Sequence, residues 1–269
     1  MKALRNILRA LFPARLRELT YPWRERLGRI PLNCAVDLRV LRRLRWSREP
    51  AEDLTVFEKR IFSQNGEDGI IAAIFAVIGT TDRYFVEFGV EDGAVCNTAL
   101  LLRQGWKGLQ MDSRDGNLPR IKREFVSAEN ISTLFDKYGV PNVFDLLSID
   151  IDGNDFWVWK SITRQPRVVV IEYNAAIPPQ ETRVIRYDPS FRWDGTDYFG
   201  AGLGALEKLG REKGYRLVAC DSRGVNAFFV EASLARDKFA PLTLEALYRP
   251  LGAPHAPKPH SGNGDWLVY

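Results

Sequence analysis

Cysteine and histidine, the side chains that most often carry metal-binding and nucleophilic chemistry, are scarce in this sequence. The three cysteines, Cys34, Cys96 and Cys220, lie far apart and are odd in number. This excludes a disulfide framework and paired-cysteine zinc or redox motifs, and it favours a reducing compartment. The two histidines, His255 and His260, both lie in a tail rich in proline and glycine, so we expect neither a buried histidine triad nor a histidine metal site. Any chemistry must therefore depend on carboxylates, amides, tyrosine or lysine.

Long apolar runs are absent as well. No stretch of about 18 uninterrupted apolar residues occurs, which argues against a membrane-spanning helix. The apolar run near the start is broken at Arg9, which argues against a secretory signal. Hydrophobic residues make up 45% of the chain and charged residues 27%, the balance of a folded globular protein. We therefore expect a cytoplasmic protein.

Positive charge is concentrated at the N-terminus. Residues 1–50 contain 13 Lys and Arg against 4 Asp and Glu, a net charge of +9, which leaves −5 for the other 219 residues. Residues 1–13 have the spacing of a basic amphipathic helix. Two interpretations stay open for this helix: contact with the periphery of an anionic membrane, or packing on the body or on a second copy of the chain. Because the body is acidic, we expect no nucleic-acid partner. The sequence does not determine the oligomeric state.

From residue 56 the pattern alternates between short apolar strands and helices. This alternation predicts an α/β fold with a mostly parallel sheet that is covered on both faces. Only a short turn separates the last two strands, so they form a terminal antiparallel hairpin. Strands are predicted at 84–89, 108–112, 124–127, 144–150, 167–173, 215–220 and 226–231, and helices at 56–78, 93–104, 131–138, 154–163 and 202–213. The predicted organisation is a basic helical N-terminal extension (1–55), a central domain (56–231) and a C-terminal tail that packs on the domain (232–269).

The segment VEFGVEDGAVC, residues 86–96, predicts a strand, a glycine-containing turn and a helix. Ligands in such folds bind at the carboxyl ends of the strands. The spacing Glu87-x-Gly89-x-x-x-Gly93 lacks the glycines of a dinucleotide fingerprint, and the acidic residues beside it would repel a pyrophosphate. A cationic ligand without phosphates, such as S-adenosylmethionine, fits this loop better, and Asp112 after the next strand is placed to accept two ribose hydroxyls. The alternative is that the glycines only form a tight turn.

These motifs resemble class I S-adenosylmethionine-dependent methyltransferases, and among them the FkbM-like group. The resemblance covers about residues 56–231 and rests on FSQNGEDG (62–69), VEFGVEDG (86–93), LQMDS (109–113), AEN (128–130), LSIDIDGND (147–155) and VIEYNA (170–175). It implies a Rossmann-like, seven-stranded sheet, S-adenosylmethionine as cofactor, and usually O-methylation of hydroxyls on sugars or other secondary metabolites. The central domain would then be a methyltransferase domain.

The resemblance also implies cofactor-binding residues. These are Glu87, Gly89 and Gly93 for the methionine part, Asp112 for the ribose, and Ser113 and Asn130 for the adenosine. This chain has IDIDG where the group usually has a segment like IDVEG, a change that keeps the carboxylate. Because functions within the group are diverse, the resemblance does not identify the methyl acceptor of this protein.

Four polar side chains follow the fourth and fifth predicted strands: Asp150, Asp152, Glu172 and Asn174. Neighbouring strand ends meet in the cleft, and residues two apart on a strand share a face. We therefore predict these four as the catalytic residues and as candidate ligands of Mg²⁺ or a similar cation. Three interpretations stay open: a metal that orients the acceptor and lowers its hydroxyl pKa, a metal-free carboxylate base, or helix capping and cofactor contact alone.

A long segment, residues 175–199, separates the fifth predicted strand from the next helix. It carries Tyr187, Phe191, Trp193, Tyr198 and Phe199. Such a loop beside a cleft suits recognition of a sugar or another polar ring, and the alternative is a flap whose aromatic side chains pack on the core. The FSQNGEDG segment forms a lid over the cofactor, or its Asn65 and Asp68 are capping residues. Trp159 is expected in the core.

The sequence therefore predicts an S-adenosylmethionine-dependent methyltransferase that acts on a hydroxyl of a glycan or secondary metabolite. Two alternatives remain. One is a small-molecule N-methyltransferase with the same cofactor site, which the paired carboxylates disfavour. The other is a catalytically silent binding or membrane-associated module that keeps the fold.

Overall fold

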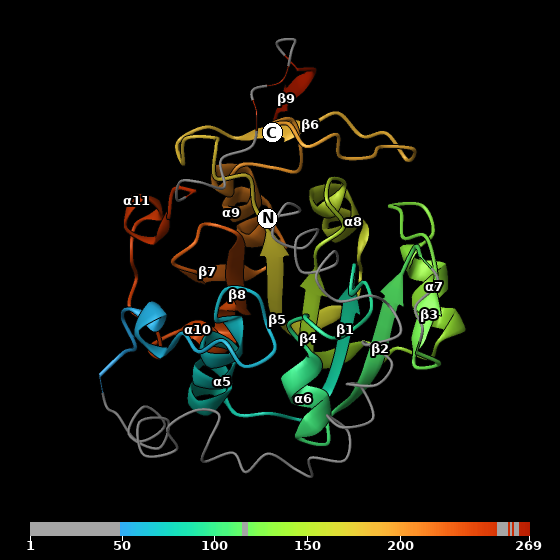
Figure 1. The fold of residues 1–269 in the computed structure, drawn as a ribbon. Coiled ribbons are helices and arrows are strands. Elements are labelled where there is room, and N and C mark those ends of the chain that lie inside the picture. The colour runs from blue at the N-terminus through green and yellow to red at the C-terminus, as the bar shows by residue number, and fades with distance from the viewer. Residues whose placement is uncertain (1–48, 115–117, 252–257, 259, 261–263) are drawn as a thin grey trace, which may run out of the picture.

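Seven strands form one sheet at the centre of the protein (Figure 1). They are β1 (Tyr84–Phe88), β2 (Lys107–Asp112), β3 (Ile121–Arg123), β4 (Val143–Ile149), β5 (Gln165–Glu172), β7 (Tyr215–Cys220) and β8 (Asn226–Glu231). Their order is β3-β2-β1-β4-β5-β8-β7. The neighbours among β1 to β5 pair in parallel, and β8 runs antiparallel to both β5 and β7. The predicted Rossmann-like α/β fold with a terminal antiparallel hairpin is confirmed.

The computed structural model describes residues 49–114, 118–251, 258, 260 and 264–269. The predicted amphipathic helix at 1–13 lies outside the described residues, as does most of the basic extension, so both interpretations of it remain predictions. The domain boundaries at 55/56 and 231/232 also remain predictions. Within the described part of the chain, no helix has the length and apolar character needed to cross a membrane.

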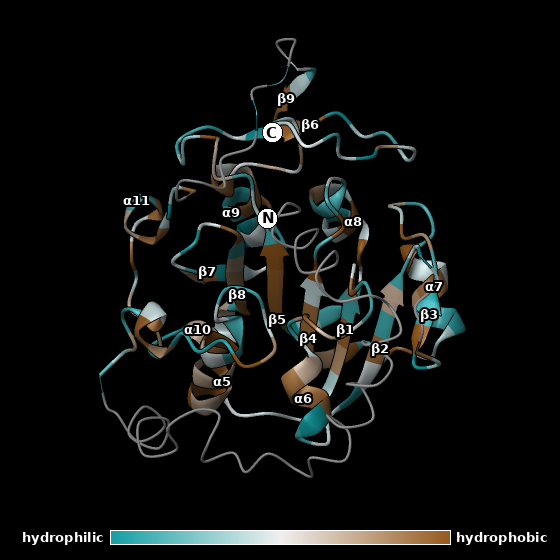
Figure 2. Cartoon of the chain, in the orientation of Figure 1, coloured by the Kyte–Doolittle hydropathy of each residue, from teal (hydrophilic) through white to brown (hydrophobic). Residues whose placement is uncertain are grey.

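Helices cover both faces of the sheet. One face packs against η1 (Leu54–Phe57), α5 (Glu67–Ile78), α6 (Ala99–Arg103) and α10 (Ala232–Ala235). The other packs against α7 (Ile131–Lys137), α8 (Asp155–Ser161), α9 (Leu203–Glu212) and α11 (Leu244–Leu247). A strand buried on both faces needs a continuous hydrophobic run rather than an alternating one. Strand β5 shows this, because residues 168–171 form an uninterrupted hydrophobic run, which is the brown part of β5 in Figure 2.

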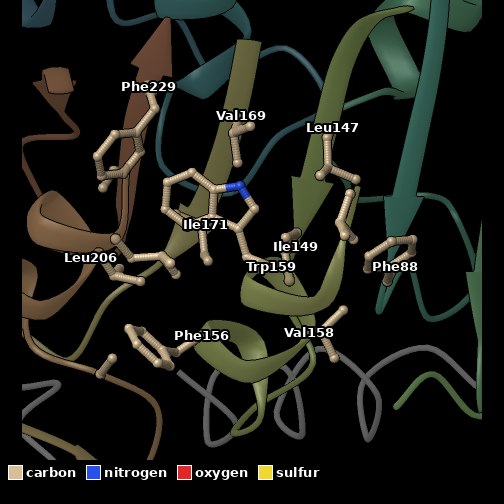
Figure 3. Close-up of a cluster of buried hydrophobic side chains, with 14 of the residues drawn as sticks. Phe88, Leu147, Ile149, Phe156, Val158, Trp159, Val169, Ile171, Leu206 and Phe229 are labelled. Carbon is tan, nitrogen blue, oxygen red and sulfur yellow. The ribbon is translucent and has the colours of Figure 1, made fainter. Parts of the chain in front are cut away.

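Trp159 of α8 lies in the centre of the core on the second face, as predicted. Its side chain is fully buried, and Figure 3 shows the indole beside Ile171 of β5 and Phe229 of β8. The ring centroids of Trp159 and Phe229 are 4.9 Å apart. Through this contact, α8 packs against the middle of the sheet. Helix α8 is the helix that follows the candidate carboxylates.

Three predicted elements are wrong in position. The strand expected at 124–127 is instead β3, at Ile121–Arg123. Residues 125–130 form a turn, because the Asn130 amide donates to the Phe125 carbonyl at 2.7 Å and accepts the Ser127 N–H at 2.9 Å. A side chain that satisfies backbone groups locally takes them out of the sheet.

The two helices expected on the first face begin later than predicted. Helix α5 starts at Glu67 rather than at 56, because one carboxylate oxygen of Asp68 accepts the N–H groups of three preceding residues, Ile61, Phe62 and Ser63. The FSQNGEDG segment therefore wraps around the first turn of α5, which favours the capping interpretation for Asp68. Helix α6 starts at Ala99 rather than at 93.

A second, two-stranded sheet lies beyond the carboxyl ends of the parallel strands, at the top of Figure 1. In it β6 (Arg183–Ile185) pairs antiparallel with β9 (Trp266–Val268). The sequence pattern does not predict this pairing, because each strand has three residues and about 80 residues separate them. The segment 175–199 is thus held in place by the end of the chain.

Candidate functional site

One register row of the central sheet joins the carboxyl ends of the parallel strands β2, β1, β4 and β5 to the start of the antiparallel strand β8. The pairings that lead to it are Phe88 with Met111 and with Ile149, and Ile149 with Ile171. One residue further along, the row contains Asp112, Gly89, Asp150 and Glu172, and Glu172 pairs with Asn226 of β8. The glycine without a side chain therefore lies between two carboxylates of the same row.

The side chains of this row lie on the face of the sheet that α5 and α6 cover. Side chains an even number of residues apart on a strand point to the same face. Phe85 of β1, Leu146 of β4, Val170 of β5 and Phe228 of β8 have the same parity as the row and pack in the cluster that includes α5. On this face the side chains in the middle of the strands are apolar, and those at the edge where the parallel strands end are polar.

A cleft opens at this edge, between the row and the starts of α5 and α6. Its wall contains three predicted site residues, Glu87, Gly89 and Asp150. The other lining residues are Gln64, Glu67, Val95, Cys96, Asn97, Val225 and Asn226. The sequence analysis missed Glu67 and Asn226 as site residues; Glu67 lies in the quoted FSQNGEDG motif, but no sequence signal singled out Asn226.

Glu87 holds the start of α6 in place. Its side chain is buried, and its carboxylate accepts the N–H of Asn97 at 2.8 Å, the N–H of Thr98 at 3.1 Å and the Thr98 hydroxyl. Burial raises the pKa of this carboxyl above its ordinary value. Glu87 therefore lies in the cleft wall as predicted, but three protein donors already bind it.

Gly89 and Gly93 shape the loop after β1. Their φ angles are +75° and +68°, in the region that favours glycine. A Cβ atom on Gly89 would lie 1.6 Å from the carbonyl oxygen of Asp150, and one on Gly93 would lie 2.9 Å from Cδ1 of Ile121. A backbone contact thus closes Gly89 to larger residues, whereas Gly93 is restricted mainly by its positive φ, because the atoms near its Cβ position are the ends of flexible side chains.

Asp112, the last residue of β2, forms hydrogen bonds that hold the loop after β1. Its Oδ2 accepts the Glu91 N–H at 2.7 Å and its Oδ1 accepts the Arg114 N–H at 2.8 Å. The Arg114 guanidinium also contacts the Asp112 carboxylate at 3.3 Å and that of Glu91 at 3.1 Å. Glu91 has a φ of +53°, so a strained residue is stabilised by this hydrogen bond.

Ser113 and Asn130, the residues expected near the adenosine, do not line the cleft. Ser113 is exposed directly after β2, and Asn130 uses its amide to form the turn after β3. The structure places them on the β2–β3 side of the sheet. Their predicted role in adenosine binding remains a prediction.

Three of the four predicted catalytic residues come together. One carboxylate oxygen each from Asp150, Asp152 and Glu172 lies within 4.8 Å of the other two, and all three side chains are partly exposed. Carboxylate oxygens at this spacing are the ligand type that a hard divalent cation binds. Asp152 has a φ of +60°, a left-handed conformation that is uncommon for a residue other than glycine.

Asn174 does not join them. Strand β5 ends at Glu172, so the rule that residues two apart share a face no longer applies to Asn174. Its side chain is fully buried and its Nδ2 donates to the carbonyls of Asp197 at 2.7 Å and Phe199 at 2.9 Å, while Oδ1 accepts the Ala176 N–H. These contacts hold the segment 175–199 at both ends, and the predicted catalytic or metal-binding role of Asn174 remains a prediction.

Asp155, which the sequence analysis did not single out, organises the loop that carries two of the carboxylates. Its Oδ1 accepts the Ile151 N–H at 2.9 Å and its Oδ2 accepts the Gly153 N–H at 2.8 Å. Burial, with a smaller contribution from the negative charge of Asp152, raises its pKa to about 6. An aspartate in the first turn of a helix is a recognisable capping signal, and it was present in IDIDGND.

The segment 175–199 covers this loop. A Cβ on Gly153 would lie 2.4 Å from the ring of Phe191, and the Asn154 amide donates to the Asp188 carbonyl at 2.8 Å. Arg192 stacks 4.5 Å from the ring centre of Phe125, in the turn after β3. Some of the aromatic side chains thus pack on the body, and their expected role in sugar binding stays a prediction.

Comparisons with known proteins give little further information. No family model matches the chain, and no curated protein matches it. A solved structure of the mitomycin 7-O-methyltransferase MmcR is similar over 61% of this chain and 56% of its own, with 14% identity and a TM-score of 0.29. The chain therefore spans little more than half the length of that protein, and a likeness of this degree carries no functional argument.

Replacing Gly89 with alanine tests the close contact between β1 and β4. Gly105 is the matched control, because it has a φ of +84° and no atom within 4 Å of its Cβ position. Both variants carry the strain of a positive φ, but G89A adds a clash with the Asp150 carbonyl. We expect G89A to lower the free energy of unfolding by about 1–3 kcal/mol more than G105A, measured by urea denaturation. Equal losses would contradict the geometry.

The raised pKa of Asp155 predicts a pH-dependent difference between wild type and D155N. The folded pKa of about 6 exceeds the ordinary value of 3.8, so the stabilising effect of the bound proton is present below pH 4 and is lost as pH rises through 6. The free energy of unfolding of wild type minus that of D155N should fall by about 2 kcal/mol between pH 4 and pH 7. Chemical denaturation at each pH measures it, and a difference independent of pH would contradict a raised pKa.

Proposed function

We propose that this protein is an S-adenosylmethionine-dependent methyltransferase of the FkbM-like group that methylates a hydroxyl of a glycan or secondary metabolite. The observation that carries the proposal is the register row itself. It places a side-chain-free glycine between Asp112 and Asp150, beside an acidic cleft at the carboxyl ends of a Rossmann-like sheet. In folds of this kind the ligand binds at that edge.

The charge of the cleft favours a cationic ligand over a phosphate. Glu67, Glu87 and Asp150 lie in its wall, and the described residues that line it include no Lys, Arg or His. S-adenosylmethionine carries a sulfonium and an ammonium group and no phosphate, so its charge complements this wall.

The backbone of the loop after β1 also disfavours a dinucleotide. Phosphate binding at a helix start needs backbone N–H groups that point at the ligand. Here Asp112 accepts the N–H of Glu91, and Glu87 accepts those of Asn97 and Thr98. Because these donors already bind protein carboxylates, the loop lacks the open cradle that a pyrophosphate requires.

The residues of the row fit the parts of the cofactor in order. Gly89 lines the cleft at the end of β1, where the methionine part would bind, and Asp112 lies beside it at the end of β2 for the ribose hydroxyls. A carboxylate has about four acceptor positions, so Asp112 can bind the loop and the ribose at the same time. Ser113 and Asn130 continue in the same direction, on the adenosine side.

Methyl transfer is an in-line displacement that needs a positioned acceptor oxygen and a route for its proton. When bound, the cofactor supplies an activated methyl group and leaves as a neutral thioether. On the β4–β5 side of the cleft, Asp150 and Asp152 can orient the acceptor hydroxyl and accept its proton. The segment 175–199, packed over the loop that carries them, limits access of water and contacts the acceptor.

The same carboxylates suit Mg²⁺ as a second cofactor. Asp150, Asp152 and Glu172 present their oxygens within 4.8 Å of one another, and a hard divalent cation would lower the pKa of an acceptor hydroxyl that binds it. This arrangement is analogous to that of some sugar and catechol O-methyltransferases. The metal-free base is the alternative mechanism for the same activity.

Calorimetric titration with S-adenosylmethionine tests the proposed cofactor. We expect wild type to bind and D112A to bind about 10–100-fold more weakly, because the ribose loses hydrogen bonds to a charged group. R114A is the matched control: it removes the exposed side chain that contacts the Asp112 carboxylate but leaves the carboxylate, so its affinity should stay within a few-fold. A folded wild-type sample that does not bind would overturn the proposal and favour a silent module.

Thermal unfolding with and without Mg²⁺ tests the metal. Because binding to the folded state alone raises stability, saturating Mg²⁺ should increase the Tm of wild type by about 3 °C or more. E172Q should lose this increase, since it removes one of three ligand charges, whereas D82N, at an exposed position outside the cluster, should keep it. An identical Tm of wild type with and without Mg²⁺ would contradict the metal and leave the carboxylate base as the mechanism.

A further inference from the structure

Asn226 is the residue of the cleft whose hydrogen bonding is incomplete. It lies at the start of β8, is 3% exposed and lines the cleft. Its Oδ1 is buried and has no hydrogen-bond partner. An unpaired buried acceptor costs about 1–3 kcal/mol, so its persistence beside a ligand cleft needs an explanation.

The neighbours of Asn226 determine which way its amide points. Its Nδ2 donates to Oε1 of Glu67 at 2.9 Å, and a carboxylate at that position can only accept, which assigns the other amide atom as the oxygen. Its backbone N–H donates to the Asp221 carboxylate, and its carbonyl accepts the Asp221 N–H at 3.0 Å. Every polar atom of Asn226 except Oδ1 is therefore bound.

Negative charge surrounds this oxygen. Glu67 is 1% exposed, and its carboxylate also accepts two hydrogen bonds from Asn65. Asp221 is buried close by, and burial together with the charge of Glu67 raises its pKa to about 7. Two buried acids and an unpaired carbonyl oxygen form an environment that a positively charged donor would stabilise.

Glu87, the acid that the sequence assigns to the methionine part of the cofactor, is less able to receive a further donor. Its carboxylate already accepts hydrogen bonds from two backbone N–H groups and a hydroxyl. In the same cleft wall, Asn226 offers an acceptor that has no donor. The wall thus contains Glu87, whose carboxylate already has three donors, and Asn226, whose buried amide oxygen has none and whose amide nitrogen binds Glu67.

We propose that Asn226 Oδ1, with Glu67 beside it, binds the ammonium group of the methionine part of the cofactor. This inference rests on the proposed function, because it names the residues that recognise one group of that cofactor. An ammonium has three donors and a positive charge, which match an acceptor with no partner and the charge of Glu67. Because the oxygen is shielded from water, the bond is stronger than an exposed one.

The test compares three ligands by calorimetry: S-adenosylmethionine, its decarboxylated form, which keeps the ammonium, and 5′-methylthioadenosine, which lacks the amino-acid part. N226L has nearly the same volume without the oxygen. It should bind the first two ligands about 10–100-fold more weakly than wild type does and bind 5′-methylthioadenosine within about twofold. V143A, which changes an exposed apolar residue at the start of β4, at the opposite end of that strand from the cleft, should leave all three affinities within about twofold.

A second variant covers the case in which N226L does not fold. E67Q keeps an acceptor for the Asn226 amide but removes the charge, so it should show the same ligand pattern with a smaller loss. If the variants bind S-adenosylmethionine as tightly as wild type does, the ammonium site is overturned. It is also overturned if they lose as much affinity for 5′-methylthioadenosine as for S-adenosylmethionine. Neither result contradicts S-adenosylmethionine as the cofactor. Failure of folded wild type to bind any of the three ligands would overturn the proposed function itself, and the ammonium site with it.

Discussion

The contact between Gly89 and the Asp150 carbonyl is the constraint on which the rest of the site depends. The carboxyl ends of β1 and β4 approach so closely there that no Cβ atom fits. The positive φ of Gly89 also turns the chain away from the sheet at this point. Gly89 adds no side chain to the row of strand ends, which carries Asp112 and Asp150 on either side of it, and the cleft lies beside this glycine.

Buried carboxylates hold the loops around the opening. Glu87, Asp112 and Asp155 each accept at least two backbone N–H groups that no helix or strand partners. One carboxylate can do this because it offers several acceptor positions and no donor. Of these three side chains, Glu87 also lines the cleft, where it adds negative charge together with Glu67 and Asp150. At Glu87, one carboxylate therefore both holds a loop in place and contributes to the charge that disfavours phosphate ligands.

The two sides of the cleft are built differently. The side proposed for the cofactor consists of strand ends and the loops directly after them, which the register of the sheet positions. The side proposed for the acceptor lies under the segment 175–199, which Asn174, the β6–β9 pairing and the contact of Phe191 with Gly153 hold in place. On the proposed function, changes in that segment could alter the acceptor without disturbing the cofactor side.

The sequence by itself determined the fold class and the location of the site. Hydrophobic strand runs, helical spacing and the short turn at 221–225 are local signals, and they predicted the sheet, its antiparallel hairpin and the carboxylates at the strand ends. Only the tertiary structure decided which polar residues meet. Asn174 and Glu172 lie two apart in sequence but separate because β5 ends between them, whereas Glu67 and Asn226 bind across 159 positions. Such contacts depend on where strands end and on how distant segments pack, and no local pattern encodes either.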